Sequence, residues 1–253
     1  FSTLMLTVDT AALANRENNI RAGFSTPLRP GLRLAWDGLS HPRWTTGTFL
    51  RTIVQHGVPH FENSYATRGA PIISSSVMRD FGKKGHLNWK HLQRIRQRWK
   101  GRLVVKGILH EDDARRAVEI GVNGIVVSNH GGRQLDGALA PLDALPAIAA
   151  AVGSDTVVML DGGIRRGSDI LKAIALGAKF VFVGRPFLYA AAAGGLDGVL
   201  LAADILKTEL HRNMALLGSC SLIEVSGHRL CEVQTIAVPS PCPLVARSAD
   251  TNI

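Results

Sequence analysis

The sequence predicts an α/β protein built from short buried strands that alternate with helices around a parallel sheet. Five apolar runs have the length and composition of strands covered on both faces: 4–8, 103–105, 125–127, 157–160 and 180–183. Three segments between them have helical periodicity, and each is followed by a glycine where a helix C′ residue belongs: 111–120, 141–152 and 168–176. This repeat predicts a TIM barrel or a doubly wound sheet, and in a barrel the chemistry lies at the carboxyl ends of the strands.

Composition restricts the class of protein. The 253 residues are 46% hydrophobic and 19% charged, which is typical of one main packed domain. The formal charge of +9 comes from scattered Lys and Arg residues, so we expect an anionic small ligand or a membrane surface and no nucleic acid. No apolar run reaches 18 residues and no leader pattern opens the chain, which indicates a cytoplasmic protein. Neither the three cysteines nor the histidines have metal-like spacing, so no metal is assigned.

The remaining segments divide the chain. After the first strand, residues 11–85 are rich in Pro, Gly and His and are predicted to form a long loop region over the barrel mouth. Residues 87–99 have the pattern of a basic amphipathic helix, and a solvated charged face is preferred to a nucleic-acid contact. Residues 226–253 are irregular and are predicted to be a tail. Residues 1–225 therefore hold the C-terminal part of a barrel, with five strands visible of eight.

One segment places an ionisable base beside a cation where a strand ends. Residues 125–136 read IVVSNHGGRQLD, so His130 and Arg133 follow a strand with two glycines between them. Glycines let the backbone approach a ligand closely. A histidine can act as a general base near neutral pH, and an arginine offers a planar fork to a carboxylate. The segment predicts a base beside an anion clamp, an interpretation preferred here to a structural histidine with a surface arginine.

Two consecutive strand ends carry the pattern of a phosphate site. The strand at 157–160 continues into DGGIR before a helix begins at Ser168, and the strand at 180–183 is followed by a glycine and an arginine. Backbone amides and a helix N-terminus bind phosphate, and the loops after the last two strands of TIM barrels frequently do so. We therefore predict a phosphate cradle made by Gly163, Arg165, Gly184 and Arg185.

Together these motifs resemble the FMN-dependent 2-hydroxy acid oxidases and dehydrogenases, the family of glycolate oxidase, L-lactate dehydrogenase, mandelate dehydrogenase and the flavin domain of flavocytochrome b2. The resemblance runs from Phe1 to about Gly218 and rests on motifs in a fixed order: LTVD at 6–9, NRE at 15–17, VVKG at 104–107, SNHGGRQLD at 128–136, DGGIRRGSD at 161–169 and VGRP at 183–186. It implies a TIM (β/α)8 barrel of the FMN-dependent type. The family's first three strands and a substrate-pocket tyrosine would precede Phe1.

The resemblance also implies roles in catalysis. His130 is identified as the catalytic base, and Asp9 as the carboxylate that orients its imidazole and stabilises the protonated form. Arg16 and Arg133 are implied to hold the substrate carboxylate through charge-assisted hydrogen bonds.

Four positions are implied to contact the flavin. Lys106 ends an apolar strand, where a cation is unfavourable without an anion, and in the family it faces the flavin N1 and O2 edge and stabilises the reduced ring. Thr7 and Ser128 fall on flavin hydrogen-bonding positions, and Asp161 falls on the position that binds the ribityl hydroxyls.

These implications predict an FMN-dependent oxidoreductase that converts an L-2-hydroxy acid, L-lactate or L-mandelate, to the 2-oxo acid. The electron acceptor is a quinone, a cytochrome or oxygen, and the resemblance implies a homotetramer. Two alternatives stay open: an inactive truncated fragment of such an enzyme, and another FMN- or phosphate-binding TIM barrel. The segment LSHPRW at 39–44, followed by Phe49, Leu50 and Ile53, resembles the loop of the family's membrane-associated dehydrogenases. It predicts a peripheral contact with the inner face of the cell membrane.

Overall fold

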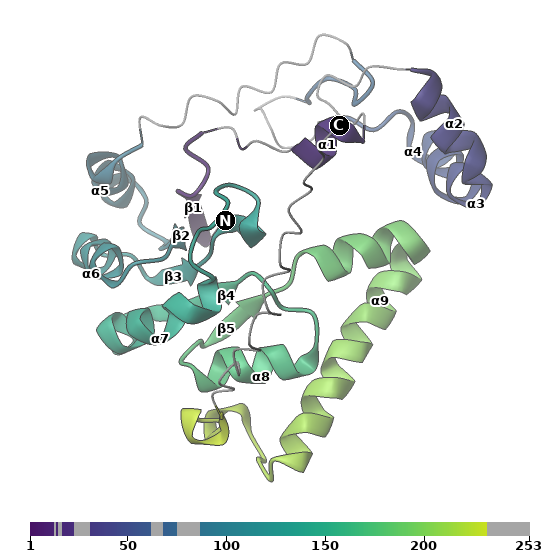
Figure 1. The fold of residues 1–253 in the computed structure, drawn as a ribbon. Coiled ribbons are helices and arrows are strands. Elements are labelled where there is room, and N and C mark those ends of the chain that lie inside the picture. The colour runs from purple at the N-terminus through teal and green to yellow at the C-terminus, as the bar shows by residue number, and fades with distance from the viewer. Residues whose placement is uncertain (13, 15–16, 23–30, 62–67, 75–86, 232–253) are drawn as a thin grey trace, which may run out of the picture.

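The computed structural model describes residues 1–12, 14, 17–22, 31–61, 68–74 and 87–231. At its centre lies one sheet of five parallel strands in sequential order (Figure 1). The strands are β1 (Thr3–Thr7), β2 (Arg102–Ile108), β3 (Gly124–Val127), β4 (Val157–Asp161) and β5 (Phe180–Phe182). Each lies within about two residues of the predicted run, except that β2 is longer. The apolar runs therefore identified all the strands of this sheet.

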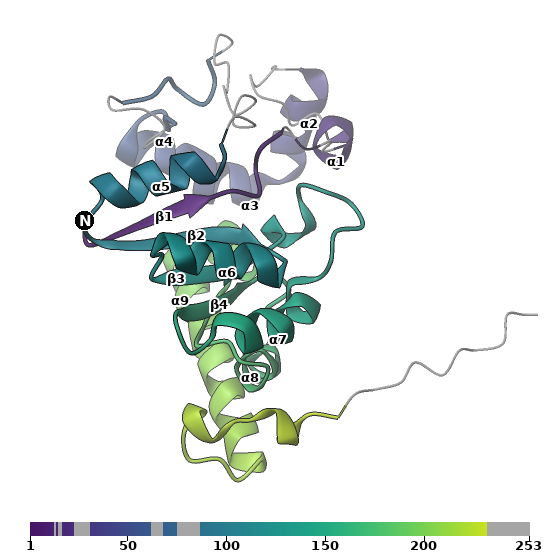
Figure 2. The same ribbon diagram turned by 90° about the vertical axis from the view of Figure 1, so that its left-hand side faces the viewer.

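Four of the helices between the strands, each directly before the next strand, cover one face of the sheet (Figure 2). They are α5 (Trp89–Arg98), α6 (Glu111–Ile120), α7 (Pro141–Val152) and α8 (Gly167–Ala175). A doubly wound sheet has helices on both faces and a point where the strand order reverses. The order β1-β2-β3-β4-β5 has no such point, so the architecture is that of a barrel segment.

The core lies between the strands and these helices. Leu103, Ile125 and Leu160 from the strands are fully buried, as are Leu145 and Ile148 from α7. Burying side chains of this size stabilises the fold by about 1.5–3 kcal/mol each. The core fixes the positions of the strand ends that follow it.

The region predicted as a loop, 11–85, contains helices among its described residues. They are α1 (Glu17–Arg21), α2 (Leu32–Ser40), α3 (Pro42–Trp44), the π-helix η1 (Thr45–Leu50) and α4 (Arg51–His56). The prediction differed because Pro42 and the π-helical turn interrupt the periodicity, and because none of the residues in α2 to α4 is buried. Figure 1 shows α2, α3 and α4 set apart from the sheet.

The long helix α9 (Arg185–Leu216) follows β5 and packs on α8. Its length and apolar composition would suffice to cross a membrane, the one such helix found in the described residues. Its backbone breaks at Gly195, where φ is 57° and ψ is −136°, and the part after the break carries charged residues such as Asp204 and Lys207. We therefore interpret α9 as two helical segments on the protein surface. Two 3-10 turns, η3 (Leu222–Glu224) and η4 (Gly227–Arg229), follow it, and most of the predicted tail lies outside the described residues.

Candidate active site

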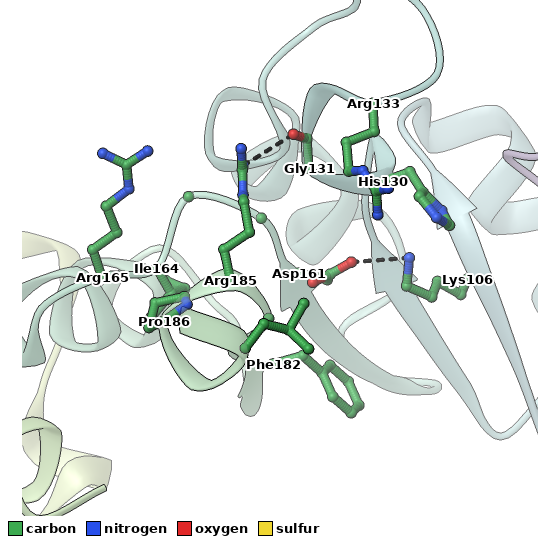
Figure 3. Close-up of a pocket in the computed structure, with 14 residues that line it drawn as sticks. Lys106, His130, Gly131, Arg133, Asp161, Ile164, Arg165, Phe182, Arg185 and Pro186 are labelled. Carbon is green, nitrogen blue, oxygen red and sulfur yellow. Dashed lines mark hydrogen bonds and ion pairs between the residues drawn. The ribbon is translucent and has the colours of Figure 1, made fainter. Parts of the chain in front are cut away.

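The strand ends of the sheet surround a pocket of about 280 Å³ (Figure 3). Residues from β2, β4, β5, the turn after β3, the loop after β4 and the start of α9 line it. They are Lys106, His130, Gly131, Arg133, Asp161, Gly162, Gly163, Ile164, Arg165, Phe182, Gly184, Arg185, Pro186 and Leu188. All of the predicted phosphate-cradle residues and both members of the predicted base and clamp pair are among them.

A histidine and a carboxylate pair across the site. The Nδ1 atom of His130 lies 3.1 Å from Oδ1 of Asp9, whose side chain is only 9% exposed. Since an ionised carboxylate only accepts hydrogen bonds, Nδ1 carries the proton in this pair and Nε2 of the neutral ring is left as the basic nitrogen. This geometry is that of a general base held by an orienting carboxylate.

The backbone around this pair has positive φ angles at His130 and at Gly107. His130 has φ of +59° in the short helix η2 (His130–Gly132), a region that non-glycine residues rarely occupy. Gly107 has φ of +107°, and a Cβ there would lie 2.6 Å from the Cβ of Asp9. The glycine after Lys106 therefore makes room for the carboxylate that faces His130. Backbone conformations of this kind cluster at functional sites.

Lys106 lies at the centre of a network of partly buried charges. Its Nζ is 2.9 Å from Oδ2 of Asp161 and 3.7 Å from Oδ2 of Asp9. It also donates to Oγ of Ser128 at 3.0 Å. The three charged side chains are between 9% and 20% exposed, so the ammonium group has the anions that its position at a strand end demands.

Ser128 and Thr7, the two hydroxyl residues predicted to contact the flavin, lie outside the lining of the pocket. Ser128 is fully buried; its Oγ accepts from the amide of His130 at 3.0 Å and donates to Asp161 at 2.9 Å. Thr7 ends β1 directly opposite Lys106 in the parallel register. Neither residue lines the pocket, and the hydrogen bonds of Ser128 position the lysine and the backbone of His130. Their roles as flavin ligands stay predictions.

The predicted phosphate cradle lies at the other end of the pocket. The guanidinium groups of Arg165 and Arg185 point the same way in Figure 3, and Arg185 donates to the carbonyl oxygen of Gly131 at 3.0 Å. Gly184 is the N-cap of α9, and the amides of Gly184 and Arg185 border the pocket, whereas Pro186 has no amide hydrogen. A helix N-terminus with two guanidinium groups is a favourable environment for an anion.

The sequence pattern also predicted a phosphate contact at the start of α8, and in the structure the amides there bind carboxylates of the protein. Oδ2 of Asp169 accepts from the amides of Arg165 and Arg166 at 3.0 and 2.9 Å. Oε2 of Glu209, from α9, accepts from the amide of Gly167 at 2.9 Å. Two carboxylates of the protein thus occupy the N-terminus of α8, and the helix end that faces the pocket is that of α9.

This contact makes stability depend on pH. The amide of Gly167, followed by the Arg166 guanidinium, holds the pKa of Glu209 below its ordinary value. A carboxyl group with a lowered pKa in the folded state stabilises the protein fully above its unfolded pKa, and the contribution is lost as pH falls through the folded pKa. We expect Glu209→Gln to be less stable than the parent chain at pH 6 and the difference to shrink towards pH 3, as measured by urea unfolding. A difference independent of pH would contradict the assignment.

Sequence reasoning missed some residues of the site. Ile164, Phe182, Pro186 and Leu188 line the pocket, but their apolar side chains resemble ordinary core residues in sequence. Gly131 contributes a carbonyl oxygen, which no side-chain pattern reveals. Conversely, Arg16 lies outside the described residues, so its predicted contact with a substrate carboxylate stays a prediction.

Comparison with known proteins agrees with the family resemblance of the sequence motifs. A family model described as FMN-dependent dehydrogenase matches residues 1–232. The L-lactate dehydrogenase of Xanthomonas campestris pv. campestris (strain B100) is 40% identical over 247 residues, which cover 95% of this chain and 61% of that protein.

Two solved structures show the same similarity. The monotopic membrane protein (S)-mandelate dehydrogenase has a TM-score of 0.81 and 35% identity, covering 92% of this chain and 61% of that one. A mutant flavocytochrome b2 with pyruvate bound has a TM-score of 0.63 and 30% identity, covering 92% and 51%. The chain thus spans about three fifths of the length of these relatives or less, and its α/β fold matches part of an FMN-dependent TIM barrel.

Proposed function

Because the chain belongs to the FMN-dependent dehydrogenase family, we propose that it binds FMN and oxidises an L-2-hydroxy acid, L-lactate or L-mandelate, to the 2-oxo acid. The observation that carries the proposal is the pairing of His130 with Asp9 at 3.1 Å beside a pocket that also contains Lys106 and Arg133. A phosphate-binding barrel of another kind would explain the cradle but would leave this base and clamp without a purpose.

The residues at hand fit FMN at both ends of the pocket. Arg165 and Arg185, with the amides of Gly163 and Gly184, would hold the phosphate, and Asp161 would be within the pocket for the ribityl hydroxyls. Lys106 would lie beside the ring, where a cation favours the reduced, anionic form. When bound, FMN supplies a ring that accepts two electrons from the substrate.

Side chains of the protein then bind the substrate and accept its proton. Arg133 binds the substrate carboxylate, and its fork geometry selects 2-hydroxy acids over plain alcohols. His130 accepts a proton from the substrate at Nε2, while Asp9 stabilises the imidazolium that forms. A quinone, a cytochrome or oxygen takes the electrons afterwards, and we propose a homotetramer as the assembly.

The visible spectrum of the purified chain with FMN tests the proposal. We expect the flavin band to remain with the protein after gel filtration and to bleach when L-lactate or L-mandelate is added without oxygen. The D-enantiomers are the control and should leave the band unchanged. Loss of all flavin on filtration would rule out FMN binding by this chain and would favour an inactive fragment.

We also propose that helices α2 to α4 attach the protein to a membrane surface. Leu32, Trp36 and Leu39 follow helical spacing on α2 and are 69–93% exposed. Exposed apolar side chains with neighbouring arginines such as Arg33 and Arg43 are typical of an interfacial segment. The similar (S)-mandelate dehydrogenase is described as a monotopic membrane protein, which supports attachment to a membrane surface. We propose the inner face of the cell membrane as that surface.

Sedimentation with anionic phospholipid vesicles tests the attachment. We expect the parent chain to pellet with vesicles, and a variant with Leu32, Trp36 and Leu39 replaced by Ser to bind at least a hundredfold more weakly, since each buried apolar side chain contributes about 1.5–3 kcal/mol. Leu200→Ser with Leu201→Ser is the matched control, because these leucines are about 60% exposed on α9. If only the α9 variant loses binding, the proposed surface is wrong.

A further inference from the structure

We propose that Glu209 is a positioning residue for phosphate recognition, because it holds Arg166 away from the pocket and leaves Arg165 to face it. This inference rests on the proposed FMN site. The chain has two adjacent arginines after β4, and either could reach an anion by sequence alone. The contacts of Glu209 indicate which of the two arginines is available to bind the phosphate.

Glu209 binds Arg166 through two contacts. Its Oε1 lies 2.6 Å from Nη2 of Arg166, and its Oε2 accepts from Nε of the same guanidinium at 3.1 Å. The Glu209 side chain is 19% exposed, whereas the Arg166 side chain is 70% exposed, so water reaches the pair from the arginine side. A bidentate pair of this kind fixes both the position and the orientation of the arginine. Arg165, by contrast, lines the pocket.

The same carboxylate also closes the start of α8. Oε2 of Glu209 accepts from the amide of Gly167 at 2.9 Å, while Asp169 takes the amides of the two arginines. A Cβ on Gly167 would lie 2.6 Å from the Cβ of Glu209, so the glycine is needed for α9 to approach this closely. Residues 165–167 are therefore bound from both helices. These contacts hold the loop at 165–167 in a single conformation. In that conformation a phosphate would contact Arg165 and the start of α9.

The affinity difference between FMN and riboflavin, which lacks the phosphate, measures this effect in the whole chain. We expect Glu209→Ala to lower the preference for FMN roughly tenfold, as for one lost charge-assisted hydrogen bond to phosphate. Glu209→Gln keeps an acceptor for the Gly167 amide and should restore part of the preference. Glu224→Ala is the matched control, because Glu224 likewise accepts a backbone amide, that of Cys220 at 2.7 Å, but this amide does not belong to residues 165–167.

The sign of the change separates positioning from other effects. Removing a carboxylate makes the region more positive, so a simple charge effect would raise the FMN preference in Glu209→Ala. A structural effect would weaken FMN and riboflavin equally. Either result, or an unchanged preference, overturns the proposal.

A second measurement needs no flavin. Trypsin cleaves after Arg165 and Arg166, and mass spectrometry identifies those cuts. We expect inorganic phosphate to slow them in the parent chain and in Glu224→Ala, but not in Glu209→Ala. If the parent chain retains neither FMN nor riboflavin, the proposed function is wrong. The protection from trypsin by inorganic phosphate still tests the role of Glu209 in that case. Equal protection in all three chains, or none in the parent, refutes that role.

Discussion

Replacing His130 by Gln is expected to slow flavin reduction by an L-2-hydroxy acid by about 10²–10⁴-fold, the range for loss of a general base. The structure explains why this residue should matter so much. Its Nδ1 is held 3.1 Å from Asp9, so Nε2 is the basic nitrogen at the pocket. Glutamine can still bind Asp9 but cannot accept the substrate proton at neutral pH. Anaerobic stopped-flow spectroscopy of the flavin band measures the rate.

The control for this prediction is His110→Gln. His110 is an exposed histidine that caps α6 by accepting from the amide of Asp112, and it does not line the pocket. We expect its variant to reduce flavin at the parent rate. Flavin content should stay the same in all three proteins, because His130 is not part of the predicted phosphate cradle. A His130→Gln protein that retains flavin and reacts at the parent rate would exclude this residue as the base.

The parts of the fold that the sequence predicts well are those fixed by local pattern. The helices at 111–120 and 141–152 have the observed bounds because an apolar stripe ends at a turn with a glycine. The glycine after each helix was expected to adopt the left-handed conformation. Gly121 does so, whereas Gly153 has a right-handed helical conformation. The helix α9 was not predicted, because its apolar residues are distributed around all sides of the helix and form no single stripe. Gly195 also interrupts the helical pattern.

The site shows a similar division between local and distant information. The strand ends mark Lys106, His130 and Arg185 as pocket residues, since carboxyl ends of parallel strands meet at one edge. The pairing of His130 with Asp9 joins residues 121 apart, and only the family resemblance suggested it. The contact of Glu209 with Gly167 spans 42 residues and has no local signal. Such contacts depend on how α8 and α9 pack, which periodicity does not encode.

Replacing Lys106 by Met is expected to lower the free energy of unfolding by about 3 kcal/mol, the lower end for breaking a buried ion pair. The ammonium group lies 2.9 Å from Asp161 and 3.7 Å from Asp9, and the lysine side chain is 17% exposed. Without it, two carboxylates face each other around Ser128 with no cation between them. Methionine has a similar length and apolar stem, so the change tests the charge more than the packing. Urea unfolding of the chain at neutral pH measures the difference.

A double-mutant cycle separates the ion pair from general damage. If Lys106 stabilises the fold through Asp161, the variant Asp161→Asn should reduce the effect of Lys106→Met, because one uncompensated charge has been removed. We expect the two changes together to destabilise by at least 1 kcal/mol less than their sum, a coupling typical of contacting charges. Lys172→Met, on the exposed face of α8, is the control and should change stability by less than about 0.5 kcal/mol. Additive effects of Lys106→Met and Asp161→Asn would mean that the lysine does not stabilise the fold through Asp161.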